Sequence, residues 1–214
     1  MELKELSFAI EQGDYIKVKE LVGKAIEEKM DPATILNDGM ISAMGIVGTN
    51  FKNGEIYVPE MLVAARAMRE GIKVLEPFLS KTGVKPIGKA IIGTVKGDLH
   101  DIGKNLVKIM LNGYGIEVHD LGVDVSSEEF VKKAIELDVD IVCLSALLTT
   151  TMPRMEEVIE LFNQSGVRSK YHIMIGGAPV TSEFAKKIGA DQYTADAATA
   201  SEKAREYLLS KKII

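Results

Sequence analysis

The sequence contains few cysteine and aromatic residues, and these shortages exclude several classes of protein. Its 214 residues include one cysteine, no tryptophan and 6% aromatic residues. A single cysteine excludes an internal disulfide and is typical of proteins of the reducing cytosol. Because Cys143 lies in the apolar run Ile141–Leu144, we interpret it as a small buried residue and not as a nucleophile.

Long apolar runs and clusters of positive charge are also missing. No run approaches the about 20 apolar residues of a membrane-spanning helix, and the segment Met1–Glu5 lacks the charged and apolar regions of a signal peptide. The net charge is −5, with no cluster of Lys and Arg of the kind that neutralises phosphates. We therefore expect a cytoplasmic protein that contacts neither a membrane nor nucleic acid.

The first 85 residues predict helices only. Asp14 can cap one helix, and Asp31 followed by Pro32 is typical of the start of another. The segment Gly48–Tyr57 predicts a turn region, after which Pro59 opens a further helix. Four helices with short connections are typical of a small bundle.

The pattern changes after the segment Lys81–Pro86, which we interpret as a linker between a helical domain, 1–85, and a second domain, 86–214. Strand-like runs follow near 89–95, 116–120, 140–145, 171–176 and 190–193. Helix-like amphipathic stretches lie near 103–113, 126–137, 153–165, 181–188 and 197–210. This alternation predicts an α/β fold, with a Rossmann-like, doubly wound parallel sheet of five strands and helices on both faces.

A polar loop follows the first of these strands. It contains Asp98, His100 and Gly103 within the run Gly97–Lys104, at the carboxyl end of the strand, where open α/β sheets bind ligands. The carboxylate of Asp98 can reach one ring nitrogen of His100 and leave the other free to bind a metal. Gly103 allows the backbone to pass close to a large ligand.

Small and hydroxyl residues mark the ends of two further strands. The run Ser145–Thr151 follows one strand, and the pair Gly176-Gly177 follows the strand that ends at Ile175. Because the carboxyl ends of parallel strands meet at one edge of a sheet, we expect a broad, flat ligand site there, with His100 at one corner.

Two kinds of phosphate-binding loop can be excluded. A dinucleotide site needs Gly-x-Gly-x-x-Gly directly after the first strand, and no register of the segment Gly93–His100 fits it. A Gly-Lys-Ser/Thr loop also fails, because Gly103-Lys104 is followed by Asn105.

The three motifs together resemble one family. Asp-x-His-x-x-Gly at Asp98–Gly103, Ser-x-Leu at Ser145–Leu147 with a nearby threonine, and Gly176-Gly177 resemble, in this order, the cobalamin-binding corrinoid proteins of methyltransferase systems. They also resemble the matching modules of cobalamin-dependent methionine synthase. The resemblance extends from about Asp14 to the carboxyl terminus. It implies cobalamin as the cofactor, as methylcobalamin or cob(I)alamin.

The resemblance also implies roles for individual residues. His100 would replace the cofactor's own base as the lower axial ligand of cobalt, Asp98 would accept a hydrogen bond from it, and Thr151 would complete a proton relay. The residues implied to bind the cofactor are Asp98, His100, Asp101, Gly103, Ser145, Leu147, Thr149, Gly176 and Gly177, together with Phe51, Val58 and Met61 of the helical domain. The last three would cover the upper face of the corrin or, alternatively, pack only in the core of the bundle.

By this resemblance the chain is a methyl carrier without turnover of its own. It would take the methyl group from a substrate-specific methyltransferase whose donor is a methylated amine, betaine or methanol. It would pass the group to a second methyltransferase that serves tetrahydrofolate or coenzyme M, and a reductive activase would restore the cofactor. One alternative is a cobalamin-binding sensor or regulatory protein, for which the residues before Asp14 supply no DNA-binding segment. Others are a subunit of an adenosylcobalamin mutase and a binding module without a cofactor.

Overall fold

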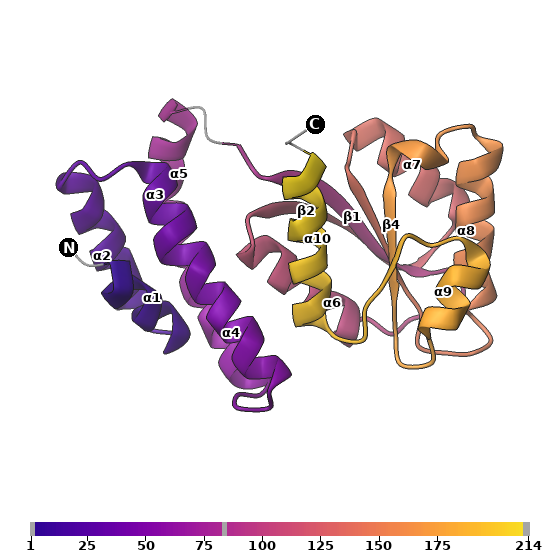
Figure 1. The fold of residues 1–214 in the computed structure, drawn as a ribbon, viewed down its shortest axis with the longest axis horizontal. Coiled ribbons are helices and arrows are strands. Elements are labelled where there is room, and N and C mark those ends of the chain that lie inside the picture. Colours follow the sequence, from indigo (N-terminus) through magenta and orange to yellow (C-terminus); the bar gives the residue numbers. More distant parts are fainter. Residues whose placement is uncertain (1–2, 83–84, 212–214) are drawn as a thin grey trace. The chain divides into compact units, whose positions relative to one another are not determined.

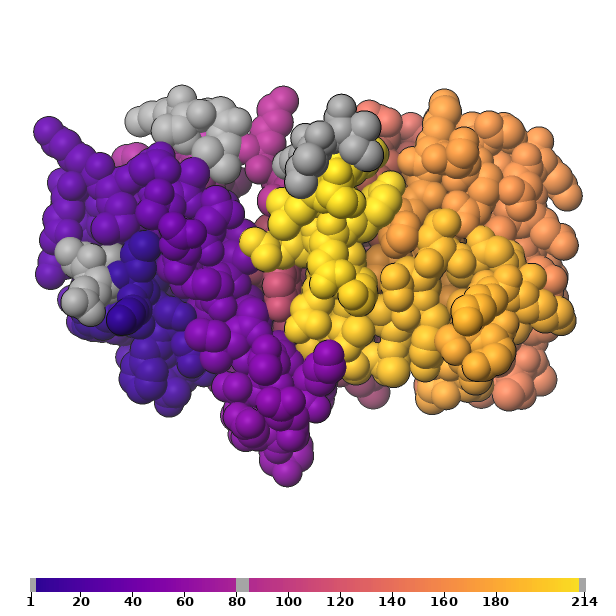
Figure 2. All heavy atoms as spheres, in the orientation of Figure 1, coloured from indigo at the N-terminus to yellow at the C-terminus, as the bar shows by residue number. Residues whose placement is uncertain are grey.

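The computed structural model describes residues 3–82 and 85–211 of the chain, which forms two compact units. One unit contains residues 1–86 and 113–115, and the other contains residues 87–112 and 116–214. The first is helical, and the second is built on a parallel sheet (Figure 1). Figure 2 shows one face of the same structure with all heavy atoms as spheres. Among the described residues, no helix has the length and apolar character needed to span a membrane.

Residues 3–82 of the first unit form four continuous helical segments, as the sequence predicts. The helices α1, α2 and α5 are separate rods, whereas α3, the π-helix η1 and α4 follow one another without a break. Their bounds are Leu3–Glu11 for α1, Tyr15–Glu27 for α2, Pro32–Thr34 for α3, Ile35–Ile41 for η1, Ser42–Lys52 for α4 and Val58–Thr82 for α5.

Capping side chains explain where two of these rods begin. The carboxylate of Asp14 accepts a hydrogen bond from the amide of Lys17 at 3.0 Å, ahead of α2. The carboxylate of Asp31 accepts one from the amide of Thr34 at 3.1 Å, with Pro32 in the first turn of α3. Each cap satisfies an amide that has no partner within its helix, so both predicted helix starts are confirmed.

Two predicted boundaries in this unit are wrong. The helix α4 continues through Lys52, so the predicted turn at Gly48–Tyr57 is confined to residues 53–57. Gly48 is buried within α4, where packing offsets the about 1 kcal/mol that glycine costs a helix. The helix α5 continues through Thr82, so the predicted linker loses its first two residues; Gly83 and Val84 lie outside the described residues.

In the described part of the second unit, five parallel strands lie in the order β2-β1-β3-β4-β5. The predicted doubly wound fold is therefore confirmed. The strands are β1 Gly88–Val95, β2 Ile116–Val125, β3 Ile141–Ser145, β4 His172–Gly176 and β5 Gln192–Tyr193. The helices are α6 Ile102–Gly113, α7 Ser127–Leu137, α8 Pro153–Gln164, η2 Arg168–Lys170, α9 Ser182–Ile188 and α10 Ala197–Lys211.

Alternate side chains of the strands form a core on each face of the sheet. One face, which includes Ile91 and Val142, packs against α7, α8 and α9, and the other, which includes Ile92 and Cys143, packs against α6 and α10. Helices therefore cover both faces, as predicted (Figure 1). Burial raises the pKa of the Cys143 thiol to about 12, which agrees with its interpretation as a packing residue.

The strand β2 is longer and less regular than the sequence predicts. It was expected to end near residue 120 and continues to Val125. Its pairing with β1 shifts twice, because Ile92 pairs with Asp120 but Gly93 pairs with Gly122 and Val95 pairs with Val125. The carboxyl half of β2 therefore contains extra residues that bulge from the ladder.

Candidate functional site

The predicted polar residues lie at the point where the strand order of the sheet reverses. The strand β1 lies between β2 and β3, so the connections that leave β1 and β3 run in opposite directions. In sheets of this order, ligands bind in the crevice beyond the carboxyl ends of these two strands. Two loops lie there, residues 96–101 after β1 and residues 146–152 after β3.

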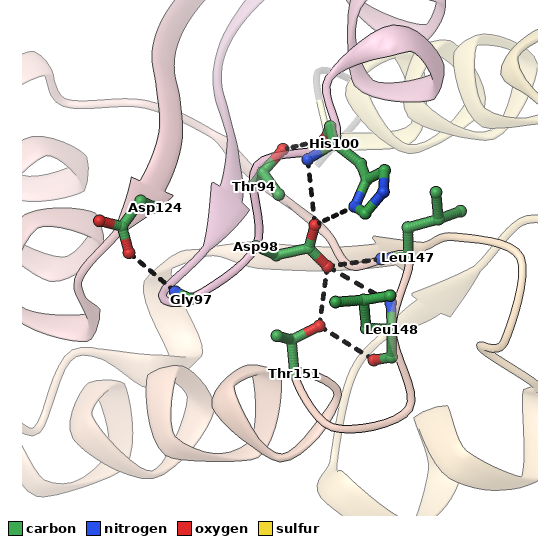
Figure 3. A network of polar contacts seen from close by, with 8 residues as sticks. All are labelled: Thr94, Gly97, Asp98, His100, Asp124, Leu147, Leu148 and Thr151. Atoms are coloured by element: carbon green, nitrogen blue, oxygen red, sulfur yellow. Dashed lines mark hydrogen bonds and ion pairs between the residues drawn. The ribbon is translucent and has the colours of Figure 1, made fainter.

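The carboxylate of Asp98 joins these two loops (Figure 3). Its Oδ1 accepts hydrogen bonds from the backbone amide of His100 at 3.1 Å and from His100 Nδ1 at 2.8 Å. Its Oδ2 accepts from the amide of Leu147 at 2.8 Å and from Thr151 Oγ1 at 2.7 Å. Asp98 is fully buried. One buried carboxylate therefore fixes the His100 loop to the loop that follows β3.

These contacts keep Asp98 ionised. Burial raises the pKa of a carboxyl group, but the hydrogen bonds from Leu147, His100 and Thr151 favour the charged form and hold the pKa of Asp98 well below its ordinary value. Because an ionised carboxylate can only accept, Nδ1 of His100 carries the shared hydrogen. In the neutral imidazole, Nε2 then holds a lone pair.

The imidazole of His100 turns Nδ1 toward the buried carboxylate of Asp98 and its other nitrogen, Nε2, away from it (Figure 3). Its side chain is 50% exposed, so Nε2 is accessible to a ligand. The predicted hydrogen bond between Asp98 and His100 is confirmed. It fixes the ring orientation and raises the basicity of the outer nitrogen, as carboxylate partners do for metal-binding histidines.

Thr151 extends this pair to a chain of three polar groups. Its hydroxyl lies 2.7 Å from Asp98 Oδ2 and 2.9 Å from the carbonyl oxygen of Leu148, and the residue is buried. A hydroxyl has one hydrogen, so it donates to one of these two acceptors at a time. His100, Asp98 and Thr151 are therefore connected by hydrogen bonds, while proton transfer along them stays a prediction.

Two residues that hold the loop were not identified from the sequence. The Thr94 hydroxyl donates to the carbonyl oxygen of His100 at 2.9 Å. The Asp124 carboxylate accepts from the amide of Gly97 at 2.8 Å, and the Asp124 amide donates to the carbonyl oxygen of Asp98 at 3.0 Å. A hydroxyl near the end of an apolar strand is a signal that could have identified Thr94. Asp124 had no such signal, because its position depends on the bulged pairing of β2.

Gly176 and Gly177 lie at the same edge, at the end of β4. The register pairs Thr94 with Ser145 and Ser145 with Gly176, so these three residues form one row across the sheet. Gly177 has a φ of 140°, and a Cβ atom there would overlap the carbonyl oxygen of Ala146. The close approach of two loops therefore requires glycine at this position, a reason that is independent of any ligand.

Exposed apolar side chains lie on both loops and at the start of α6. Leu99 and Ile102 are 71% and 78% exposed, and Leu147 is 42% exposed. Gly103 is also exposed, and the space that its Cβ atom would occupy is open. The two loops and the start of α6 therefore offer accessible apolar surface, as ligand sites usually do.

The remaining predicted residues lie outside this network of hydrogen bonds. Asp101 and Thr149 belong to the same two regions and are exposed. Phe51, Val58 and Met61 belong to the helical unit, at the end of α4 and the start of α5. Phe51 and Val58 are half-buried, whereas Met61 is fully buried.

Family models match both parts of the chain. A model described as a B12 binding domain matches residues 88–203, and a second model with the same description matches residues 2–76. The first of these covers the sheet and the loops that carry Asp98, His100 and Thr151. The fold and the site thus define a cobalamin-binding protein.

Relatives that match nearly the whole of this chain define the family more narrowly. Dimethylamine corrinoid protein 2 of Methanosarcina acetivorans is 45% identical over 98% of this chain and 97% of its own. A chain of the methanol:cobalamin methyltransferase complex of Methanosarcina barkeri is 31% identical, with a TM-score of 0.85 over 97% of this chain and 79% of that chain. A cobalamin-binding protein of Desulfitobacterium hafniense is 28% identical, with a TM-score of 0.82 over 96% of this chain and 98% of that chain. The chain belongs to the family of cobalamin-binding corrinoid proteins of methyltransferase systems.

The residues at the sheet edge fit cobalamin. The corrin ring brings most of the ligands of its own cobalt, so a single imidazole nitrogen, such as Nε2 of His100, is sufficient on the protein side. A large ring also needs an accessible apolar surface, which Leu99 and Ile102 offer.

Proposed function

We propose that the chain is a methyl carrier in which His100 replaces the cofactor's own base as the lower ligand of cobalt. The hydrogen bond between His100 Nδ1 and Asp98, 2.8 Å long, carries this proposal because it leaves Nε2 free and oriented. When bound, cobalamin supplies the cobalt that accepts and releases the methyl group. The chain supplies the ligand, its orientation and a place to hold a proton.

Asp98 and Thr151 are proposed to adjust how strongly His100 binds. The charge of Asp98 would raise the basicity of His100 Nε2 as a ligand, and it would stabilise the imidazolium whenever Nε2 holds a proton instead. The Thr151 hydroxyl can turn between Asp98 and the carbonyl oxygen of Leu148, both of which lie within hydrogen-bond distance. It can therefore follow the change of charge on the pair.

Other residues at the edge are proposed to hold the rest of the cofactor. Ser145 and Gly176 form a row of small residues that would leave room for the nucleotide tail of the cofactor, and the open space at Gly103 would allow the corrin ring to approach α6. The remaining residues assigned to cofactor binding are Asp101, Leu147, Thr149 and Gly177.

In the helical unit, we assign Phe51 and Val58 to the cover of the upper face, because both retain exposed surface. Met61 has none, and its packing would have to change before it could touch a ligand.

The relatives support a class of methyl donor and a first partner. Proteins of Methanosarcina that are 45% and 44% identical to this chain are named dimethylamine corrinoid proteins, so a methylated amine is the proposed class of donor. The similarity to a chain of a methyltransferase complex supports a substrate-specific methyltransferase as the first partner. A second methyltransferase, serving tetrahydrofolate or coenzyme M, and a reductive activase complete the proposed system.

The ligand proposal can be tested by electron paramagnetic resonance of the protein loaded with cob(II)alamin. The wild type is expected to show hyperfine coupling to a histidine nitrogen, and His100→Ala is expected to lose it. A matched control is His119→Ala, because His119 lies within β2 and pairs with Glu117 at 3.0 Å. Coupling from the cofactor's own base in the wild type, or unchanged coupling in His100→Ala, would overturn the assignment.

The carrier proposal can be tested by methylation of the loaded protein. With a methylated amine and its methyltransferase, the protein is expected to gain one methyl group, and to lose it only after addition of a second methyltransferase and its acceptor. Rapid methylation of the acceptor by the loaded protein alone would contradict a carrier role.

A further inference from the structure

The ammonium of Lys104 is buried, and Lys104 lies four residues after His100, in the first turn of α6. Its side chain is only 2% exposed. The ammonium lies 2.6 Å from Asp120 Oδ1 and 2.8 Å from Asn105 Oδ1. Lysine is almost never fully buried unless it is paired, and a buried ion pair often gives no more stability than apolar residues of the same volume. Stability alone therefore does not explain why a charged pair occupies this position.

Asp120 connects the first turns of α6 to the bulged half of β2. Its Oδ1 also accepts a hydrogen bond from the amide of Gly122 at 2.9 Å, and its Oδ2 accepts one from Lys108 Nζ at 3.0 Å. Burial raises the pKa of Asp120, but the hydrogen bonds from Lys104, Gly122 and Lys108 outweigh it and lower the pKa to about 2. The carboxylate is therefore ionised, and both of its oxygens accept hydrogen bonds.

The same strand holds the other end of the His100 loop. Asp124, four residues beyond Asp120, accepts from the amide of Gly97 and donates its own amide to the carbonyl oxygen of Asp98. Polar contacts to β2 thus lie on both sides of His100 in the sequence. Asp124 contacts Gly97 and Asp98 before it, and Asp120 pairs with Lys104 after it.

We propose that Lys104 is a positioning residue for His100. By fixing the first turn of α6 to β2, its ion pair with Asp120 sets where the imidazole stands relative to the cobalt. This inference rests on the proposed role of His100 as the cobalt ligand. It gives the bulged half of β2 a role in placing His100, in addition to the role of the hydrogen bonds of Asp98.

Two lysines of α6 provide a matched test. Lys104→Met and Lys108→Met each remove one cation from Asp120 and leave the other in place, but Lys108 has a side chain that is 36% exposed and is eight residues from His100. In the protein loaded with cob(II)alamin, Lys104→Met is expected to lower cobalamin affinity about tenfold and to reduce the fraction of cobalt coupled to histidine. Lys108→Met is expected to leave both near wild type.

Hydrogen exchange of the cofactor-free protein gives a second readout. The amides of residues 99–105 are expected to exchange faster in Lys104→Met than in Lys108→Met, while those of β3 and β4 remain protected. Equal histidine coupling, affinity and exchange in the two variants would overturn the inference.

A double variant covers the case in which Lys104→Met folds poorly. Lys104→Met/Asp120→Leu replaces the pair with apolar residues and removes the buried charge, so it is expected to fold. The inference predicts weakened histidine coupling in this stable protein; full coupling would show a structural role only and overturn it. If the wild type itself lacks histidine coupling, the proposed function fails as well, whereas normal wild-type coupling with unaffected variants overturns the inference alone.

Discussion

The two units carry their candidate residues in different ways. In the α/β unit, Asp98, His100 and Thr151 are joined by hydrogen bonds of 2.7 and 2.8 Å, and the carboxylate between them is fully buried. In the helical unit, Phe51 and Met61 are apolar residues of a packed assembly, one half-buried and one fully buried. A buried polar residue needs hydrogen-bond partners, and these partners identify a polar site. Apolar residues that contact a ligand cannot be recognised in this way, because they have the same chemistry as residues of the core.

The largest expected loss of stability follows a substitution at the edge of the sheet. Gly177→Ala places a Cβ atom against the carbonyl oxygen of Ala146 at a φ of 140°, so the two loops have to separate. We expect a loss of about 4 kcal/mol or more in the free energy of unfolding, or failure of the α/β unit to fold. Urea denaturation followed by circular dichroism measures this.

Gly103→Ala is the control, because open space surrounds its Cβ position in α6. Alanine is expected to leave the cofactor-free protein unchanged or up to about 1 kcal/mol more stable, and to weaken cobalamin binding. A loss of stability at Gly103 as large as at Gly177 would contradict the distinction between a glycine needed by the fold and one needed by the ligand.

The second prediction compares the stability lost at a core position and at a half-buried position of the helical unit. Met61→Ala is expected to cost about 3 kcal/mol of unfolding free energy, because it empties space at a fully buried position. Val58→Ala, at a half-buried position, is expected to cost less than half as much. Thermal unfolding of both variants tests this order, and equal losses would place both residues in the core.

The α/β unit could be predicted more completely than the helical unit. Its strands and helices alternate, and strand ends are marked by short polar or glycine motifs, so residues such as His100 and Gly176 could be placed at one edge from the sequence alone. The contact between Asp98 and His100 followed from a separation of two residues on a loop. These are local relations, which a sequence displays directly.

Relations that depend on tertiary structure could not be predicted. The bulges of β2, and hence the role of Asp124, arise from pairing with β1. The extension of α4 through Gly48 depends on burial, which outweighs the low helix propensity of glycine. Likewise, the amphipathic pattern alone did not distinguish the buried Met61 from the half-buried Phe51.

The third effect concerns acid stability. The pKa of Asp120 is lowered to about 2, so its ion pairs stabilise the fold above the unfolded-state pKa of about 4, and this contribution is lost as the pH falls toward 2. The difference in unfolding free energy between wild type and Asp120→Asn is therefore expected to shrink by about 2 kcal/mol over this window. Denaturation at several pH values checks this, with the more exposed Asp124→Asn as the comparison. A difference that stays constant with pH would show that Asp120 does not act through its charge.

The smallest expected effect tests whether the helical unit contributes to the cofactor site at all. If Phe51 covers the upper face of the bound cofactor, it confines the methyl radical formed when light breaks the cobalt–carbon bond, and recombination is favoured. Phe51→Ala should then photolyse faster than wild type, while cobalamin affinity changes by less than about threefold, because most of the binding surface is assigned to the other unit. Phe8→Ala is the control, since Phe8 is a 62% exposed phenylalanine of α1. The measurement is the rate at which aquocobalamin appears under fixed illumination. Equal rates in all three proteins would make the helices a scaffold or a docking surface. The two units would then differ in function as well as in chemistry, because only the α/β unit would contact the cofactor.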